Sequence, residues 1–215
     1  IRDRYLLTKF LYMLGDNLPV LIPLIPDKRV KLSIQDTERY FINRDNIGCI
    51  TRELQKNRLR DAVARQDKVL LIGHSMGSVI AYEVLWQLSR DQKSELHVDL
   101  LLTSGSPLGQ SIVQRHLMGA HAKGAERYPG NIRQWINVAA VGELTAIDMQ
   151  LKNDFGEMVD LGLVPDIDDR DSFNYYHMHG TLNVHAEYGY LINEEIARIV
   201  SKWWRSCQSG EVPGA

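Results

Sequence analysis

The sequence predicts an α/β fold with a mostly parallel central sheet and helices on both faces. Short apolar runs alternate along the chain with amphipathic segments of helical period. Hydrophobic residues make up 44% and charged residues 24% of the chain, which is ordinary globular usage. At 215 residues the chain suits one hydrophobic core, so we expect a single domain over residues 1–215.

The first predicted elements are a helix and a strand. Residues 51–65 place apolar side chains at near-helical spacing between charged ones, which favours an amphipathic helix. Residues 69–72 form a continuous apolar run, as expected of a strand buried on both faces of a parallel sheet. We therefore predict that this strand is central.

A second helix and two more strands follow. Ile80, Val84 and Leu88 recur at i, i+4 and i+8, which predicts a helix over residues 77–89. Residues 98–103 and 134–141 are apolar runs, and the chain between them is long enough for a crossover. These elements continue the strand and helix alternation of a parallel sheet.

The end of the chain predicts one more helix and, before it, an acidic loop. Asn193 is a good N-cap residue, and the apolar residues that follow it recur at helical spacing. Before this helix, acidic residues crowd a short segment that lacks the glycine and terminal glutamate of a calcium loop. We expect a solvated loop here, containing Asp166, Asp168, Asp169 and Asp171.

Composition excludes several function classes. The formal charge is −2 and Lys and Arg form no block, so we expect no nucleic-acid partner. The apolar runs are far shorter than the roughly 20 residues of a transmembrane helix. Cys49 and Cys207 are far apart, which argues against a disulfide scaffold and favours a reducing, cytoplasmic location.

His177 and His179 lack a defined third ligand, so we expect no metal and no cofactor.

The strand at 69–72 leads into the pattern Gly73-His-Ser75-Met76-Gly77, and the helix follows at once. This order of strand, Gly-x-Ser-x-Gly and helix is typical of a nucleophile elbow, in which glycines allow close backbone approach to a strained serine. We therefore expect Ser75 to be a nucleophile. The Met76 N–H, at the helix N-terminus, would stabilise an oxyanion.

A serine nucleophile needs a general base, and the chain has seven histidines. In hydrolases of this kind the histidine follows the nucleophile and the acid, on a loop ahead of the final helix. His185 has that place, and His179 is its main rival.

The third member of such a site is an acid that holds the imidazole tautomer, and it lies beyond an intervening strand. Glu143 is two residues past the run that ends at Val141, and Asp148 is seven residues past it. Glu143 has the shorter reach, and Asp148 remains the alternative.

Together these motifs resemble the serine α/β-hydrolase superfamily, in its lipase/esterase-like bacterial branch. The resemblance covers roughly residues 50–205 and rests on four segments. They are Leu71-Ile-Gly-His-Ser-Met-Gly-Ser-Val-Ile-Ala-Tyr82, Thr103-Ser-Gly-Ser-Pro-Leu-Gly109, Trp135-Ile-Asn-Val138 and Asn183-Val-His-Ala-Glu-Tyr-Gly-Tyr-Leu191. It implies the α/β-hydrolase fold, with Gly105–Gly109 either in the wall of an acyl pocket or in an ordinary turn.

The chain departs from the family pattern in two ways. Family members often have Asp-Pro-Val-Ala where this chain has Glu143-Leu-Thr-Ala, so the resemblance carries the acid role to Glu143. Family members usually have an early His-Gly loop that gives the second oxyanion N–H, and no His-Gly precedes Ser75. Either the strand before that loop lies ahead of Ile1, or the second donor comes from elsewhere.

The expected activity is hydrolysis of a carboxylic ester or a lipid acyl bond through an acyl-enzyme on Ser75. The expected partner is a small-molecule ester or lipid substrate. Thioesterase, amidase and acyltransferase activities would use the same residues, since the triad activates the nucleophile without choosing the acceptor. The other function class is a non-catalytic binding module of the same fold.

Overall fold

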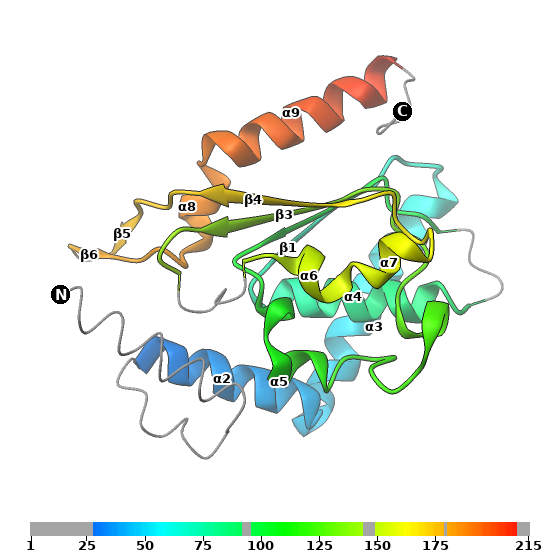
Figure 1. Ribbon diagram of the computed structural model, residues 1–215, viewed down its shortest axis with the longest axis horizontal. Coiled ribbons are helices and arrows are strands. Elements are labelled where there is room, and N and C mark those ends of the chain that lie inside the picture. Colours follow the sequence, from blue (N-terminus) through cyan, green and yellow to red (C-terminus); the bar gives the residue numbers. More distant parts are fainter. Residues whose placement is uncertain (1–27, 92–95, 144–148, 179, 210–215) are drawn as a thin grey trace.

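A four-stranded parallel sheet, in the order β1-β2-β3-β4, forms the centre of the molecule (Figure 1). The computed structural model describes residues 28–91, 96–143, 149–178 and 180–209. Its elements are α2 (Lys28–Phe41), η2 (Arg44–Asn46), α3 (Ile47–Ala64), β1 (Leu70–His74), α4 (Met76–Leu88), β2 (Leu100–Ser104), η3 (Pro107–Gly109), α5 (Ser111–Gln114), η4 (Gly124–Arg127), β3 (Trp135–Ala140), α6 (Leu151–Phe155), α7 (Glu157–Asp160), β4 (Ile167–Ser172), β5 (His177–Met178), β6 (Thr181–Leu182), α8 (Glu187–Leu191) and α9 (Glu194–Ser209).

The predicted α/β fold is confirmed, because helices cover both faces of this sheet. Side chains alternate across each strand, so Leu101 and Trp135 join the core cluster that includes α4, while Leu102 and Val138 join the cluster with α8 and α9. All residues of β2 and β3 are buried, as expected of strands covered on both sides. Figure 1 shows α9 on one side of the sheet and α3, α4 and α6 on the other.

The predicted helices at 51–65, 77–89 and after Asn193 are confirmed as α3, α4 and α9, with shifted bounds. The Asn193 side chain accepts a hydrogen bond from the Glu195 N–H at 2.8 Å, as an N-cap residue does. The predicted strands are confirmed as β1, β2 and β3. Strand β2 begins at Leu100, because Val98 makes only an isolated bridge to Ile132.

The expectation that the first strand is central is wrong for the part of the chain that the structure describes. Within it, β1 pairs with β2 alone and lies at one edge of the sheet. Ile72 is 43% exposed, unlike the fully buried residues of β2. The apolar run correctly predicted a strand but not its place in the sheet.

The expectation of a solvated acidic loop is wrong for Asp168, Asp169 and Asp171, since Ile167–Ser172 is strand β4, whereas Asp166 lies just before the strand and is exposed. Two of its acidic residues, Asp168 and Asp169, have specific partners. Asp169 accepts hydrogen bonds from the Leu151 and Lys152 N–H groups at 3.0 and 2.9 Å, at the start of α6. Arg170 makes ion pairs of 2.6 Å with Asp168 and Glu195. A charged strand is stable at this position because β4 is the other edge of the described sheet.

Helix α2 was not predicted, and a buried polar cluster joins it to α3 and α4. Tyr40 donates to Glu83 Oε2 at 2.6 Å, and Arg52 Nη1 donates to the same oxygen at 2.9 Å. The Met118 N–H donates to Glu83 Oε1 at 3.1 Å. Because the buried carboxylate has these donors, the cluster fixes α2 and α3 against the helix that follows Ser75.

Candidate active site

Ser75 occupies a sharp turn between β1 and α4. Its φ of 52° and ψ of −130° lie in a region that L-residues rarely adopt, at a cost of about 1–3 kcal/mol. Two hydrogen bonds hold this turn: the Ser75 N–H donates to Ser104 O at 3.0 Å, and Ser78 Oγ donates to Ser75 O at 2.6 Å. The sheet and the helix therefore both fix the strained residue, as the predicted nucleophile elbow requires.

The two glycines of the pattern have different roles. A Cβ at Gly73 would lie 2.7 Å from Ser78 Cα, so glycine there allows the first turn of α4 to approach the strand. A Cβ at Gly77 would meet no atom of the described residues within 4 Å. The expectation that both positions need glycine for backbone approach is therefore supported at Gly73 only.

We expect Gly73→Ala, but not Gly77→Ala, to lower the stability of the protein. Gly73→Ala should lower the free energy of unfolding by about 1–3 kcal/mol, because the methyl group overlaps fixed backbone. Gly77→Ala should leave it unchanged or raise it by up to about 1 kcal/mol, because alanine loses less entropy than glycine in a helix. Urea unfolding of both variants beside wild type measures this. Equal losses in both would contradict the difference in packing.

His185 lies in the segment between β6 and α8 and reaches the serine. Its Nε2 is 3.0 Å from Ser75 Oγ, and its Nδ1 is hydrogen bonded to Glu143 Oε1. With Nδ1 protonated, the ring donates to the carboxylate and leaves Nε2 to accept the serine proton. The structure thus brings together Ser75, His185 and Glu143, the three residues expected from the sequence.

The sequence also offered Asp148 as the acid and His179 as the base. Asp148 and His179 both lie outside the described residues.

Glu143 reaches the histidine because a tight turn follows β3. The Glu143 N–H donates to Ala140 O at 3.0 Å, and Gly142 adopts a φ of 91° that favours glycine. The turn brings the Glu143 carboxylate back to the carboxyl ends of the strands. Glu143 is only 2% exposed there.

Gly105 makes room for the carboxylate and the histidine. Its φ is 51°, and a Cβ there would lie 2.8 Å from Glu143 Oε1 and 3.3 Å from His185 Nδ1. Next to it, the Ser106 and Ser78 hydroxyls are hydrogen bonded at 2.7 Å. The Gly-Ser-Pro segment after β2 therefore borders the site. The sequence left open whether this segment lines an acyl pocket or forms an ordinary turn.

His74, inside the elbow, is a neighbour that sequence reasoning did not assign. Its Nε2–H donates to the His185 backbone carbonyl at 2.9 Å, and the two ring centroids are 4.8 Å apart. Burial, and then the neighbouring His185, hold the pKa of His74 below its usual value. A neutral His74 suits this hydrogen bond and adds no positive charge beside the expected base.

The predicted oxyanion donor, Met76, is the first residue of α4. The N–H groups of a helix's first turn lack helical acceptors, and the helix dipole favours negative charge there. The Met76 side chain contacts α2, where Thr37 Oγ1 lies 3.1 Å from Met76 Sδ. The donor role of Met76 stays a prediction.

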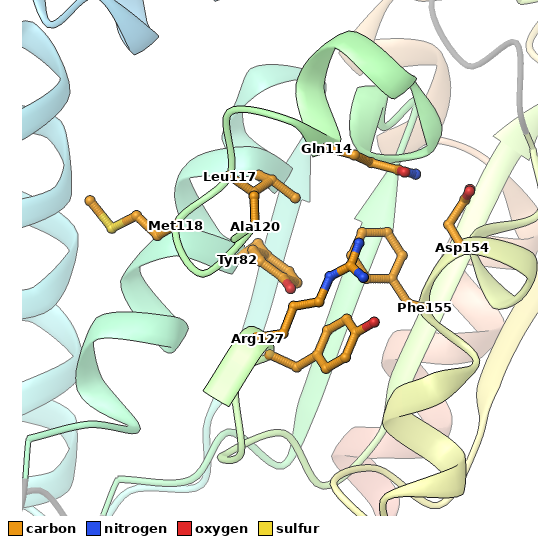
Figure 2. A pocket seen from close by; sticks show the side chains of 9 residues that line it. Tyr82, Gln114, Leu117, Met118, Ala120, Arg127, Asp154 and Phe155 are labelled. Carbon is orange, nitrogen blue, oxygen red and sulfur yellow. The ribbon is translucent and has the colours of Figure 1, made fainter. Parts of the chain in front are cut away.

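Figure 2 shows a small cavity on the α4 side of the sheet. Its volume is about 10 Å³, close to the least that holds one water molecule, so it is too small for an acyl chain. It is lined by Tyr82, Gln114, Leu117, Met118, Ala120, Arg127, Tyr128, Asp154 and Phe155. The lining of this cavity does not include Ser75, His185 or Glu143.

The described residues contain neither a membrane-spanning helix nor a cluster that could hold a metal ion. Within this part of the chain, no helix combines the length and the apolar character needed to cross a bilayer. The same residues contain no group of three His, Cys, Asp or Glu side chains arranged to hold a metal ion.

One comparison with known proteins agrees with the class suggested by the elbow. Residues 33–124 match the family model of Lecithin:cholesterol acyltransferase, a family in the lipase-like group of α/β hydrolases. The match begins within α2, covers α3, β1, the elbow, α4 and β2, and ends before Glu143 and His185. It supports an enzyme of the acyl-transfer kind. Neither the curated proteins nor the solved structures gave a match.

Proposed function

We propose that this protein is a serine hydrolase that cleaves a carboxylic ester or lipid acyl bond through an acyl-enzyme on Ser75. The observation that carries the proposal is the continuous hydrogen-bonded chain from Ser75 Oγ through His185 to Glu143. The Ser75 turn between β1 and α4 is a second support, and the family match over residues 33–124 is a third.

The proposed reaction has two halves. His185 Nε2 takes the Ser75 proton as Oγ attacks the acyl carbon, and Glu143 stabilises the imidazolium. The Met76 N–H donates to the oxyanion. Collapse of the resulting tetrahedral intermediate breaks the bond to the alcohol leaving group, and the leaving group takes the proton from His185. Water then attacks the acyl-enzyme with His185 again as base, which releases the acid and frees Ser75.

Acyl transfer to an alcohol is the second candidate function, favoured by the family match. The name of that family contains both an acyl donor, lecithin, and an alcohol acceptor, cholesterol. In this chain the second half-reaction would differ only in its nucleophile, because His185 could deprotonate a bound hydroxyl instead of water. Thioesterase or amidase activity would differ in the leaving group alone.

Two parallel incubations separate hydrolysis from transfer. The purified chain is given phosphatidylcholine vesicles with a labelled acyl group, with or without cholesterol, and products are resolved by thin-layer chromatography. We expect labelled free fatty acid in both cases if the protein is a hydrolase, and labelled steryl ester if cholesterol is an acceptor. A short p-nitrophenyl ester is the positive substrate, and Ser75→Ala is the control. A folded chain that turns over no ester, thioester or amide would favour the binding module.

Three finer proposals rest on the sequence alone: one domain over residues 1–215, membership of the bacterial lipase/esterase-like branch, and a cytoplasmic location. Both Cys49 and Cys207 are free thiols, which is compatible with a reducing compartment.

A further inference from the structure

Tyr190 contacts the proposed acid at the carboxylate oxygen that is not bonded to His185. It lies on α8, is 2% exposed and packs in the core cluster on the α9 side of the sheet. Its hydroxyl donates to Glu143 Oε2, while His185 is bonded to Oε1 of the same carboxylate. The two carboxylate oxygens are therefore each held by a different donor.

The backbone of β3 orients the Tyr190 hydroxyl. The Ala140 N–H donates to the phenol oxygen at 2.8 Å, so the phenol proton is directed to the carboxylate. Burial, and then the Glu143 charge, raise the pKa of Tyr190 well above its ordinary value. The phenol consequently keeps its proton and acts as a donor at every pH at which the site would work.

Tyr190 follows His185 by five residues, and the short segment between them is locked in place. Asn174 Nδ2 donates to Ala186 O at 2.9 Å. A Cβ at Gly189 would lie only 1.7 Å from Asn174 Oδ1, so glycine allows α8 to pack directly on this side chain. One rigid segment thus presents both donors to Glu143.

We propose that Tyr190 is a positioning residue that holds the Glu143 carboxylate against His185, so that Tyr190, Glu143, His185 and Ser75 work as one hydrogen-bonded chain. This inference rests on the proposed function. It also gives a reason for glutamate at this position: glutamate has one more rotatable bond than aspartate, and a second anchor removes that freedom.

The first test is Tyr190→Phe, which removes only the hydroxyl. Loss of a hydrogen bond to a charged group should lower kcat for a p-nitrophenyl ester by about 10- to 100-fold. KM should change little, because Tyr190 does not touch the substrate. Tyr82→Phe is the matched control, since Tyr82 is equally buried but lines the small cavity of Figure 2. Its kcat should stay near that of wild type.

A double-mutant cycle separates positioning from a purely structural role. Tyr190→Phe is also made in a Glu143→Gln background, and the rate of Ser75 labelling by a fluorophosphonate is measured in all four proteins, because single-event labelling works for slow variants. If Tyr190 acts through Glu143, its loss should cost less than about threefold in the Glu143→Gln background. Equal losses in both backgrounds, or full activity of Tyr190→Phe, would overturn the proposal.

Failure of the Tyr190 proposal and failure of the proposed function give different results in these experiments. If Ser75 is not the nucleophile, wild type and Ser75→Ala behave alike and no protein is labelled at Ser75. If only the Tyr190 proposal is wrong, wild type is active, Ser75→Ala is inactive, and Tyr190→Phe equals wild type or loses the same factor in both backgrounds. Urea unfolding of each variant verifies that the proteins compared are folded.

Discussion

Ser75→Ala is expected to lower kcat for a short p-nitrophenyl ester by about 10⁴- to 10⁶-fold, because it removes the proposed nucleophile. The variant should fold, since the hydrogen bonds that hold the turn use the Ser75 backbone: its N–H donates to Ser104 O, and its carbonyl accepts from Ser78. Ester turnover and urea unfolding measure the two expectations.

Ser89→Ala is the matched control for this substitution. Ser89 follows the other end of α4, and its hydroxyl donates to Trp86 O at 2.9 Å, far from the elbow. Its kcat should equal that of wild type. Unchanged turnover in Ser75→Ala would end the proposal that Ser75 forms an acyl-enzyme.

Glu143→Gln should cost about 10⁴ in kcat, the size of effect known when the acid of a Ser-His-Asp protease triad is replaced by its amide. The amide cannot hold the His185 tautomer as a carboxylate does, whereas Ser75 and the elbow are unaltered. Kinetics with an activated ester measure the loss.

Asp148→Asn is assayed beside it, because Asp148 is the alternative acid from the sequence. It should keep nearly all of the activity if Glu143 has the acid role. A large loss confined to Asp148→Asn would transfer that role without affecting the proposals for Ser75 and His185.

The sequence predicted the sheet best where burial alone determines the side chains. Strands β2 and β3 are covered on both faces, so their apolar runs were easily recognised. Strand β4 was mistaken for a loop because its stability depends on pairs such as Arg170 with Glu195 and Asp169 with the start of α6. Those partners are distant in sequence, and no local pattern reveals them.

The buried cluster of Tyr40, Arg52 and Glu83 was missed for the same reason. Arg and Glu are expected at the surface in a sequence read alone, and Tyr is only intermediate in burial. Their contacts join α2, α3 and α4, and Glu83 lies 43 residues from Tyr40 and 31 residues from Arg52 along the chain. Only the tertiary arrangement supplies the hydrogen bonds that permit burial.

At the candidate site, local and chain-order signals were informative to different extents. The elbow is a local motif, so Ser75 could be predicted from Gly-x-Ser-x-Gly between a strand and a helix, although the packing reason given for Gly77 was wrong. Chain order suggested Glu143 and His185, and the structure brings both to Ser75. Tyr190 had no such signal, because a tyrosine on a five-residue helix gives no hint that its hydroxyl meets Glu143.

The most direct measurement for the central claim is covalent labelling of the intact protein with a fluorophosphonate, followed by mass spectrometry. An activated Ser75 attacks phosphorus, fluoride leaves and the Oγ–P bond remains, so the protein should gain one adduct on the peptide that contains Ser75. Ser75→Ala should gain none. A folded wild-type protein that stays unlabelled, or that carries its adduct on another residue, would contradict the assignment of Ser75 as the nucleophile.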